Sequence, residues 1–362
     1  MSTSVVRPEP AIAQPPTKTR ALATVTAEDR FVELGSWVGG FALAWLLNTK
    51  LLPWSGGLAL ALTTIVAGLV VLAVATSITE PRPVVVDRVV AALIHVGALI
   101  VGLALLSTIV FILVRGFAAL PHVALLTQDM SGVGPRDDFN RGGILHAIVG
   151  SLIQVGIAIV ITVPLGIGTA VFMTEVGGKY ARIVRTVVEA MTALPSIVAG
   201  LFIYTVMIVT LGLSRSGLAA SLALAVMMLP IIARASDVVL SVVPGGLREA
   251  SLALGASRWR TVWHVVLPTA RPGLATAQIL GVARGIGETS PVLLTSGAAG
   301  FLVLNPTDGV MNSLPLFIYT TVRSGEPMYI ARAFAAATVL LFIVLILFVM
   351  TRYLARPRKG SR

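Results

Sequence analysis

The sequence predicts an all-helical protein that crosses a membrane several times. Hydrophobic residues make up 56% of the 362-residue chain and charged residues only 12%, whereas about a quarter of the residues in soluble domains are charged. Apolar stretches of about 20 residues, the length that a helix needs to span the hydrocarbon core, recur along the chain. Lys and Arg gather on alternate sides of these stretches, as they do in proteins with several membrane spans.

Eight apolar stretches are long enough to span a bilayer, and we expect each to be a transmembrane helix. They occupy residues 34–52, 57–78, 89–114, 144–173, 183–211, 216–239, 274–296 and 333–353. The first is the least apolar, because Asn48, Lys50 and Pro53 shorten it and two adjacent glycines weaken it as a helix. The first two stretches could instead form a re-entrant hairpin.

The chain divides into a front part, a six-span core and two tails. Residues 1–30 are polar and lack an apolar run, so they predict a disordered cytoplasmic tail rather than a cleavable signal peptide. Residues 31–88 hold two additional membrane segments and end in a stiff linker, Glu80-Pro81-Arg82-Pro83. Residues 89–353 form the six-span core, and residues 354–362 form a basic tail.

The basic residues predict that both ends of the chain lie in the cytoplasm. With eight spans starting inside, most of the 27 Lys and Arg residues fall on the cytoplasmic side, including those of the C-terminal tail. A reversed topology would place that tail outside. The net charge of +11 is therefore a sorting signal with an attraction to anionic membrane lipid, and nucleic-acid binding is a poor explanation for it.

Several kinds of chemistry are excluded. The chain has no cysteine, and its histidines (His95, His122, His146 and His264) are scattered without the spacing of metal ligands. No glycine-rich loop followed by Lys-Ser or Lys-Thr occurs, so the chain has no nucleotide-binding P-loop, and any ATP must be hydrolysed elsewhere. We therefore expect a protein that is not an enzyme and binds no metal or cofactor itself.

Four spans of the core contain a proline, namely Pro164, Pro195, Pro230 and Pro291. A proline inside a span frees a backbone carbonyl, which neighbouring helices or water in a cavity must then satisfy. The four prolines favour kinked helices around a central pathway, although proline is in general more frequent in membrane helices than in soluble ones.

Two outer segments join the spans of the core. Residues 115–141 are polar and rich in turn residues, and a second segment runs from about 297 to 332. Within the second, residues 312–319 could form a short amphipathic helix that faces a soluble partner or caps the pathway. They could equally form a loop packed on the bundle.

A polar segment between two apolar runs, residues 244–268, predicts a helix-turn-helix elbow. Pro244-Gly245-Gly246 breaks the preceding helix, and a short helix follows from Leu247 to Leu254, with Glu249 in its first turn, where an anion suits the helix dipole. Gly255 ends this helix. Ser257 then caps a second helix, which we expect Pro268 to close.

The elbow offers apolar side chains, Leu252 and Leu254, for helix-in-groove docking onto a partner. The alternative is an amphipathic connector that lies on the lipid surface. The spacing of Glu249-Ala250-Ser251, Gly255 and Val265-Val266-Leu267-Pro268 resembles the EAA motif of ABC importer permeases, E-A-A-x3-G-x9-I-x-L-P, with Ser251 and Val265 as departures. The resemblance implies that the elbow, within a coupling loop of residues 244–271, docks onto a separate cytoplasmic ATPase.

Two pairs of charged residues lie within apolar spans. Arg284 and Glu288 are four residues apart, and Arg234 and Asp237 are three apart, so each pair shares a helix face. An arginine at mid-bilayer costs about 2.5 to 3.5 kcal/mol on insertion scales, so it needs a partner or a wet cavity. Each pair is therefore either a structural salt bridge or part of a polar pathway.

The surroundings of Arg284 suit an oxyanion. Gly285 and Gly287 leave space beside it, and Thr289 and Ser290 add hydroxyl donors. An arginine fork binds a tetrahedral oxyanion through two hydrogen bonds. Glu288 would orient Arg284 and partly offset its charge, so that the anion is held weakly enough to be released.

Residues 283–294, A-R-G-I-G-E-T-S-P-V-L-L, resemble the A-R-x-x-G-E-T-A-P-L-L signature of PstA-type phosphate permeases, with Ser290 and Val292 as mild departures. Residues 229–237 resemble the family's L-P-x-x-x-R-x-x-E stretch, with Asp237 in place of Glu. The resemblance covers residues 140 to 350 and implies a six-helix type I importer (MetI-like) core with two additional N-terminal helices. It also implies that Arg284, Glu288, Thr289, Arg234 and Asp237 line the route of phosphate.

The family further implies the partners and the location. The chain would pair with a PstC-type permease and two copies of a PstB-type ATPase, which bind ATP and Mg²⁺, and would receive phosphate from a PstS-type binding protein outside the inner membrane. A permease for another oxyanion or small solute would keep the elbow but need other pathway residues. A secondary transporter or channel would not need the elbow, and the cost of the buried charges argues against a mere scaffold.

Overall fold

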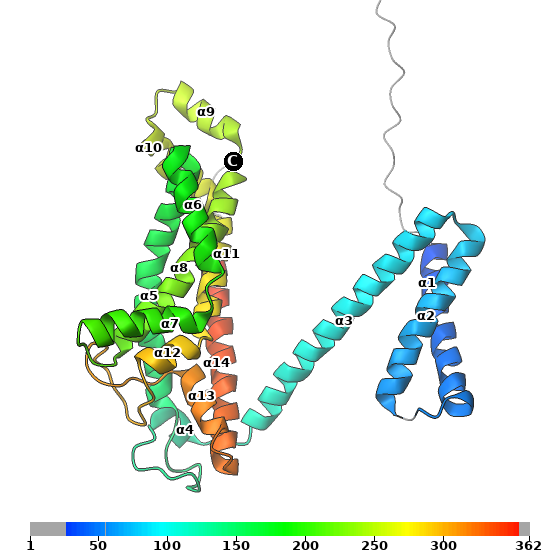
Figure 1. Ribbon diagram of the computed structural model, residues 1–362, viewed down its shortest axis with the longest axis horizontal. Coiled ribbons are helices and arrows are strands. Elements are labelled where there is room, and N and C mark those ends of the chain that lie inside the picture. The colour runs from blue at the N-terminus through cyan, green and yellow to red at the C-terminus, as the bar shows by residue number, and fades with distance from the viewer. Residues whose placement is uncertain (1–26, 55, 355–362) are drawn as a thin grey trace, which may run out of the picture. The chain divides into compact units, whose positions relative to one another are not determined.

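The computed structural model describes residues 27–54 and 56–354, whose regular structure is entirely helical, as predicted (Figure 1). The predicted N-terminal tail lies almost wholly outside the described residues, and so does most of the C-terminal tail. Contacts between residues divide the chain into two units at Ser107 and Thr108, which lie within helix α3 (Arg82–Gly116). The division expected at the proline-containing linker falls at the start of the same helix and stays a prediction.

Unit 1 contains α1 (Ala27–Leu46), the π-helical turn η1 (Leu47–Leu51), α2 (Gly57–Thr79) and most of α3. The first two helices pack so closely that a side chain at Gly40 would meet the backbone of Gly68 at 2.4 Å. Small residues allow such close approach between membrane helices. Each of these two helices is long and apolar enough to cross a membrane by itself, which favours two spans over a re-entrant hairpin.

Unit 2 begins with the end of α3 and contains the rest of the chain. Its further elements are α4 (Val123–Thr127), α5 (Leu145–Val171), η2 (Phe172–Val176), α6 (Gly178–Thr192), α7 (Ser196–Ile203), η3 (Tyr204–Thr210), α8 (Gly217–Ser241), α9 (Gly245–Ala253), α10 (Arg258–Thr261), η4 (Val262–Val266), α11 (Leu267–Ile286), α12 (Ser290–Thr295), α13 (Leu314–Val322) and α14 (Pro327–Leu354).

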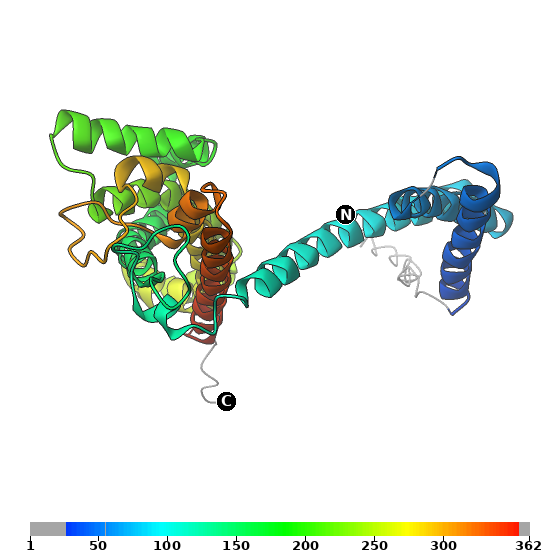
Figure 2. The ribbon, with the colours of Figure 1, turned by 90° about the horizontal axis from the view of Figure 1, so that it is seen from below.

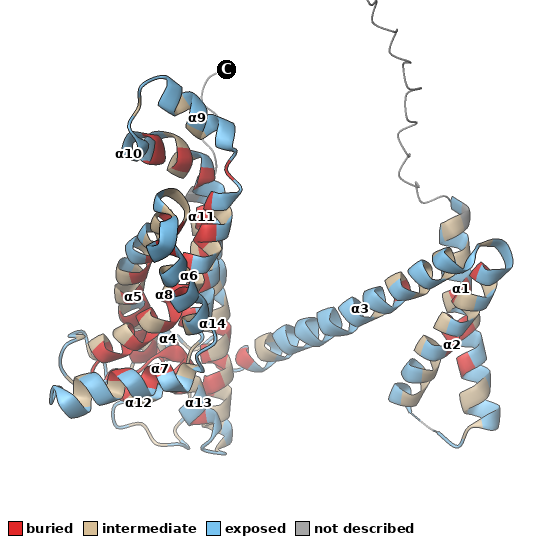
Figure 3. Ribbon diagram, turned by 45° about the horizontal axis from the view of Figure 1, so that its top comes forward, coloured by how far each residue is buried: buried red, intermediate tan, exposed pale blue. Residues whose placement is uncertain are grey.

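Helix α8 is the centre of unit 2, and α5, α6, α7 and α11 pack around it. Met228 and Ile232 of α8 are fully buried, and a side chain added at Gly281 or Gly285 of α11 would meet them at 2.4 Å. Helix α14 packs along α11, as the two views show (Figure 1, Figure 2). Buried residues gather on α8 and its neighbours, whereas the outward faces are exposed, as expected for helices that contact lipid (Figure 3).

Among the described residues, six helices are long and apolar enough to cross a membrane, and a bent pair would make a seventh. The bent pair replaces the predicted span of residues 183–211: α6 and the helix formed by α7 and η3 meet at 105°, so the single kinked helix expected there is instead broken into two helices. The break precedes Pro195, which disfavours helical backbone at Leu194 and has no amide to donate. The predicted span of residues 274–296 is not among these candidates; it corresponds to α11, which carries Arg271 and Arg284, followed by the short α12.

The four prolines of the core occupy two kinds of position. Pro164 and Pro230 lie inside α5 and α8, as expected. Pro195 instead precedes α7 and Pro291 lies in the first turn of α12, where a missing amide hydrogen removes no helical hydrogen bond. Two of the four prolines therefore start helices rather than kink them.

Candidate functional site

The predicted elbow forms at one end of unit 2, and α4 and α13 lie toward the other end (Figure 1). Helix α9 ends at Ala253, and Gly255 has a φ of +82°, a left-handed conformation that glycine adopts without strain. The hydroxyl oxygen of Ser257 accepts a hydrogen bond from the Arg260 amide at 3.4 Å and so caps α10. The first short helix, the glycine after it and the serine cap of the next helix are as predicted.

The helix after the cap does not end at Pro268, so the prediction that this proline closes it was wrong. α10, η4 and α11 follow one another without interruption, and Pro268 lies in the first turn of α11. The Leu267 amide donates to the carbonyl of Val262, five residues earlier, as in a π-helical turn. Because Pro268 has no amide hydrogen, this wider turn lets the helix pass through the proline. The elbow is thereby joined to α11 by continuous helix.

Side chains fix the elbow to the bundle. Arg248 of α9 lies 2.8 Å from Glu175 of η2 and donates to the carbonyl oxygen of Val243 at 2.7 Å. The hydroxyl of Ser251 lies 2.9 Å from the hydroxyl of Thr261 and links the two halves of the elbow. The serine that departs from the EAA pattern thus makes a hydrogen bond that alanine could not make.

The outward face of the elbow is open. No residue of α9 is buried, Glu249 and Leu252 are exposed, and Leu254 is 90% exposed. Trp259 and Trp263 are also exposed and contact each other edge to face, with 5.9 Å between ring centroids. Large apolar side chains exposed on a structure fixed to the bundle are typical of a surface that a partner or lipid covers.

The first charged pair belongs to a network between α6 and α8. Asp237 is buried, and its carboxylate accepts hydrogen bonds from Arg185 of α6 at 2.9 and 3.2 Å and from the hydroxyl of Thr174 at 3.1 Å. Arg234 lies 2.8 Å from Glu189 of α6 but 3.8 Å from Asp237. The nearest partners of both predicted residues therefore come from another helix rather than from each other.

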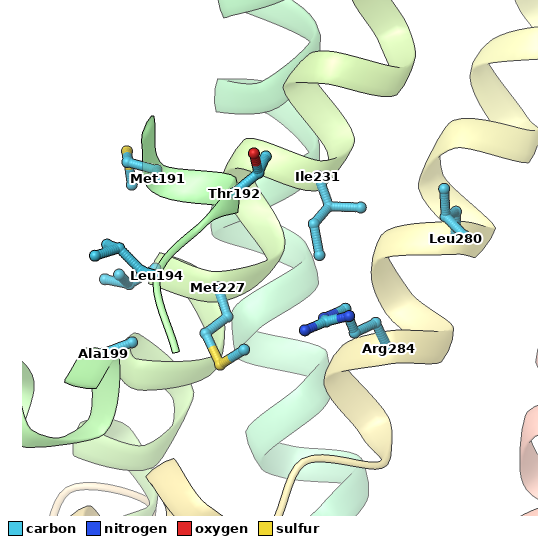
Figure 4. Close-up of a pocket in the computed structure, with 9 residues that line it drawn as sticks. Met191, Thr192, Leu194, Ala199, Met227, Ile231, Leu280 and Arg284 are labelled. Carbon is cyan, nitrogen blue, oxygen red and sulfur yellow. The ribbon is translucent and has the colours of Figure 1, made fainter. Parts of the chain in front are cut away.

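The second pair is looser and borders a cavity. Arg284 Nε lies 3.8 Å from Glu288 Oε1, and the Arg284 side chain is 59% exposed. Its side chain extends from α11 toward Met227 and Ile231 of α8 (Figure 4). The cavity, of about 300 Å³, is lined by Met191, Thr192, Leu194, Ala199, Val226, Met227, Ile231, Leu280 and Arg284. Among these described lining residues, Arg284 alone is charged.

The Arg234 and Arg284 pairs both lie close to the cavity, but the two pairs do not contact each other. Arg234 lies three residues beyond the cavity residue Ile231 on α8, and Glu189 lies three residues before the cavity residue Thr192 on α6. The Arg234–Glu189 pair is thus about 4.5 Å farther along each helix, less than one turn from the cavity. Thr289 precedes α12 and is half-buried. That these residues line a substrate route stays a prediction.

At the opposite end of unit 2, residues 314–319 form part of α13, and residues 312 and 313 precede that helix. Residues 311–317 are buried, and the Leu314 amide donates to the hydroxyl of Ser151 on α5 at 2.7 Å. Buried Gln154 donates to the hydroxyl of Ser296 at 3.2 Å. The helix forms, but its first half is covered by the bundle, which favours the packed alternative over a face turned to a soluble partner.

Arg332 of α14 is fully buried, although it lies at the end of the second outer segment, residues 297–332. Its guanidinium donates to the carbonyl oxygens of Asp137, Asp138 and Arg141 at 3.0, 2.8 and 2.7 Å, and it lies over the ring of Phe139. A buried arginine is tolerated when carbonyl dipoles and aromatic faces replace water. Arg332 therefore fixes the polar outer loop to α14.

Asp129 ties the same outer loop to the second outer segment. Its carboxylate accepts hydrogen bonds from the amides of Ser131, at 3.1 Å, and Leu302, at 3.0 Å. The pKa of Asp129 is lowered, first by the hydrogen bond from Ser131 and also by that from Leu302, because both favour the charged form. The described residues hold no group of three or more His, Asp or Glu side chains placed to bind a metal ion.

Arg185 and Glu189 were missed as members of the charged network, but a signal for them exists. They are four residues apart within the stretch expected to span the membrane, and the rule applied to Arg284 and Glu288 applies equally to them. Arg248 and Glu175 are separated by 73 residues, and Arg332 and its loop by more than 190. No local pattern in the sequence indicates those two sets of contacts.

Comparisons with known proteins show which family the chain resembles. Residues 162–359 match the family described as "Binding-protein-dependent transport system inner membrane component". The phosphate transport system permease protein PstA 1 of Mycobacterium tuberculosis is 41% identical over 234 residues, which are 64% of this chain and 76% of that protein. PstA of Haemophilus influenzae is 34% identical over 265 residues, 72% of this chain and 91% of the relative.

Solved structures with a similar backbone are more distant. A chain of the MetNI methionine ABC transporter, in an inward-facing conformation, is 22% identical and superposes with a TM-score of 0.47 over 59% of this chain and 93% of that one. A chain of a bacterial alginate ABC transporter is 18% identical, with a TM-score of 0.47 over 72% of this chain and 96% of that one.

Proposed function

The chain belongs to the binding-protein-dependent transport system inner membrane components and, among them, to the PstA type, and on this premise we propose that it is half of the translocation pathway of an ATP-driven importer of inorganic phosphate. One observation carries the proposal: Arg284 is exposed in a cavity on the same continuous helix that begins at the elbow. The proposed anion-binding arginine and the proposed ATPase-docking elbow would thus lie on one continuous helical element.

Arg284 has the chemistry and the freedom that an anion site needs. At 3.8 Å, Glu288 is too far for a close ion pair, so the guanidinium keeps donors available for a tetrahedral oxyanion. Glu288 still offsets part of the charge, which keeps the anion from being held too tightly to leave. Thr289 adds a hydroxyl nearby in the chain, and Arg234 would be the next basic group along the route.

Asp237 would act at one remove from the anion. It is buried and already accepts hydrogen bonds from Arg185 and Thr174. We expect it to position Arg185, and through its longer contact Arg234, rather than to touch an anion that carries the same charge. This places the predicted pathway residues in two roles, contact and positioning.

The elbow would receive the ATPase. Glu249, Ala250 and Gly255 form its outward helix and turn, and Val265, Leu267 and Pro268 form the helical passage into α11. Arg284 lies 16 residues after Pro268, which is about 24 Å along a helix. A push on the elbow would therefore shift or tilt the segment that carries Arg284 as a unit.

The proposed assembly has further subunits. A PstC-type permease would complete the pathway, two copies of a PstB-type ATPase would bind ATP and Mg²⁺, and a PstS-type binding protein would deliver phosphate. The elbow and both chain ends would face the cytoplasm across the inner membrane. The number and distribution of Lys and Arg residues support this orientation.

Uptake of radiolabelled phosphate by the complete transporter in proteoliposomes tests the proposal. Changing Arg284 to Gln should lower uptake by about ten- to hundredfold, because a charge-assisted hydrogen bond to the anion is lost. Changing exposed Arg182 of α6 to Gln removes the same charge away from the cavity and should leave uptake intact. Full phosphate uptake by Arg284→Gln would reject phosphate as the solute that Arg284 selects. So would inhibition of the parent's uptake by unlabelled sulfate and molybdate that is as strong as inhibition by unlabelled phosphate.

A further inference from the structure

A large apolar groove of unit 2 is lined by largely different elements from the cavity. Its volume is about 810 Å³, and it lies between α5 with η2 and the run from α10 to α11, with Thr351 of α14 at its edge. Apolar walls come from Val171, Phe172, Trp263 and Leu274, among others. The size and lining suit hydrocarbon chains rather than a polar solute.

The groove and the substrate cavity are separate sites. The cavity is lined from α6, α7, α8 and α11, whereas the groove receives no residue from α6, α7 or α8. On α11 the cavity uses Leu280 and Arg284, and the groove uses residues nearer the elbow, from Leu267 to Gln278. The groove is thus near the elbow end of the helix.

The groove has features of a membrane interface. Trp259 and Trp263 line it and are 65% and 54% exposed, and tryptophan is enriched where hydrocarbon meets headgroups. Arg271 also lines it and is exposed. Within the described part of the chain, no carboxylate forms a salt bridge with Arg271, so its charge has no nearby acidic partner in this fold.

We propose that this groove binds one anionic phospholipid, with acyl chains against α5 and α11 and the headgroup phosphate on Arg271. Basic pockets between membrane helices on the cytoplasmic side bind anionic headgroups, and a zwitterionic lipid would gain less from the same arginine. The unpaired arginine beside an apolar groove is complementary in charge and shape to such a lipid. This inference goes beyond the transport of phosphate and does not depend on which solute is carried.

Tryptophan quenching by brominated lipid tests the proposal in the full-length chain. Replacing Trp37, Trp45 and Trp54 by Phe leaves Trp259 and Trp263 as the only tryptophans. The chain is reconstituted in phosphatidylcholine bilayers, into which chain-brominated phosphatidylglycerol or chain-brominated phosphatidylcholine is titrated. One basic residue at the surface should make half-quenching occur at about a fivefold lower fraction of the anionic lipid.

Charge variants separate a specific site from general contact with lipid. Arg271→Gln should abolish the preference for phosphatidylglycerol, and Arg271→Lys should retain most of it. Arg182→Gln, which removes the charge of an exposed residue of α6 outside the groove, should leave the preference unchanged. Equal quenching by the two lipids in the parent, or an unchanged preference in Arg271→Gln, would overturn the proposal.

A steric pair tests whether the chains occupy the groove. A Cβ atom added at Gly168, which lines the groove, would have no atom within 4 Å, so Gly168→Leu should fill the groove without disturbing α5. Gly156 on the same helix is equally unobstructed but lies outside the groove, so Gly156→Leu is the control. Gly168→Leu should weaken quenching by the anionic lipid while Gly156→Leu does not, and equal behaviour of the two variants would also overturn the proposal.

Discussion

The two charged clusters of unit 2 differ in how completely their charges are satisfied. Around Asp237, two helices contribute the partners, and the carboxylate is buried with hydrogen bonds on both oxygens. Around Arg284, one helix and the turn after it contribute a single acid at 3.8 Å, and the guanidinium faces a cavity. The Asp237 cluster, which we call the closed cluster, holds α6 against α8. The Arg284 cluster, which we call the open cluster, leaves hydrogen-bond donors free for a ligand.

The largest expected difference between the two clusters is the loss of stability on changing Asp237. Changing Asp237 to Ala leaves Arg185 without its carboxylate and should destabilise the fold by about 2 to 4 kcal/mol, below the upper range for a fully buried pair because Arg185 is 41% exposed. The apparent melting temperature of the purified complex in mild detergent measures this effect. Arg284→Gln is the matched change in the open cluster and should melt like the parent. If both variants melt alike, the distinction between closed and open clusters is wrong.

Glu288 sharpens the comparison at the open cluster. Glu288→Gln removes the charge that offsets Arg284, so an anion should bind more tightly and leave more slowly. The phosphate concentration at half-maximal uptake should fall by up to about fivefold, and the maximal rate should fall with it. Concentration-dependent uptake by the reconstituted transporter measures both. An unchanged half-maximal concentration would mean that Glu288 is a structural partner without influence on the anion.

Arg234 should have a much smaller effect on stability than Asp237. Arg234 and Glu189 are 44% and 50% exposed, and exposed ion pairs contribute about 0 to 1 kcal/mol. Arg234→Gln should therefore shift the melting temperature much less than Asp237→Ala, while any loss of uptake should be smaller than that of Arg284→Gln. A loss of uptake as large as that of Arg284→Gln would mean that Arg234 binds the anion as directly as Arg284 does.

Local patterns predicted much of the elbow and left the charged network incomplete. Gly255 and Ser257 end and begin helices through their own backbone and side chain, so their neighbours in sequence suffice to place them. The partner of Asp237 on α6 is 52 residues away, and only the packing of α6 on α8 brings it close. Pairs at i, i+3 and i, i+4 are visible in a sequence, whereas cross-helix pairs are not.

The same limit explains the two errors about proline. Pro195 was expected inside a span and lies instead between two helices at 105°, whereas Pro268 was expected to end a helix and lies within one. A proline disfavours helix locally, but the neighbouring backbone decides the outcome. At Pro268 the π-helical turn before it compensates, and nothing in the composition of Val262–Val266 distinguishes that turn from an ordinary helix.

The π-helical turn also sets the direction in which Arg284 points. A π turn contains about one residue more than an α turn, and each residue of an α-helix rotates the chain by about 100° around the axis. If Val262–Val266 tightened into α-helix while the elbow stayed in place, α11 would turn by roughly that angle and carry Arg284 away from Met227 and Ile231. A change of one hydrogen-bond register beside the elbow would thus be enough to swing the arginine between facing the cavity and facing elsewhere.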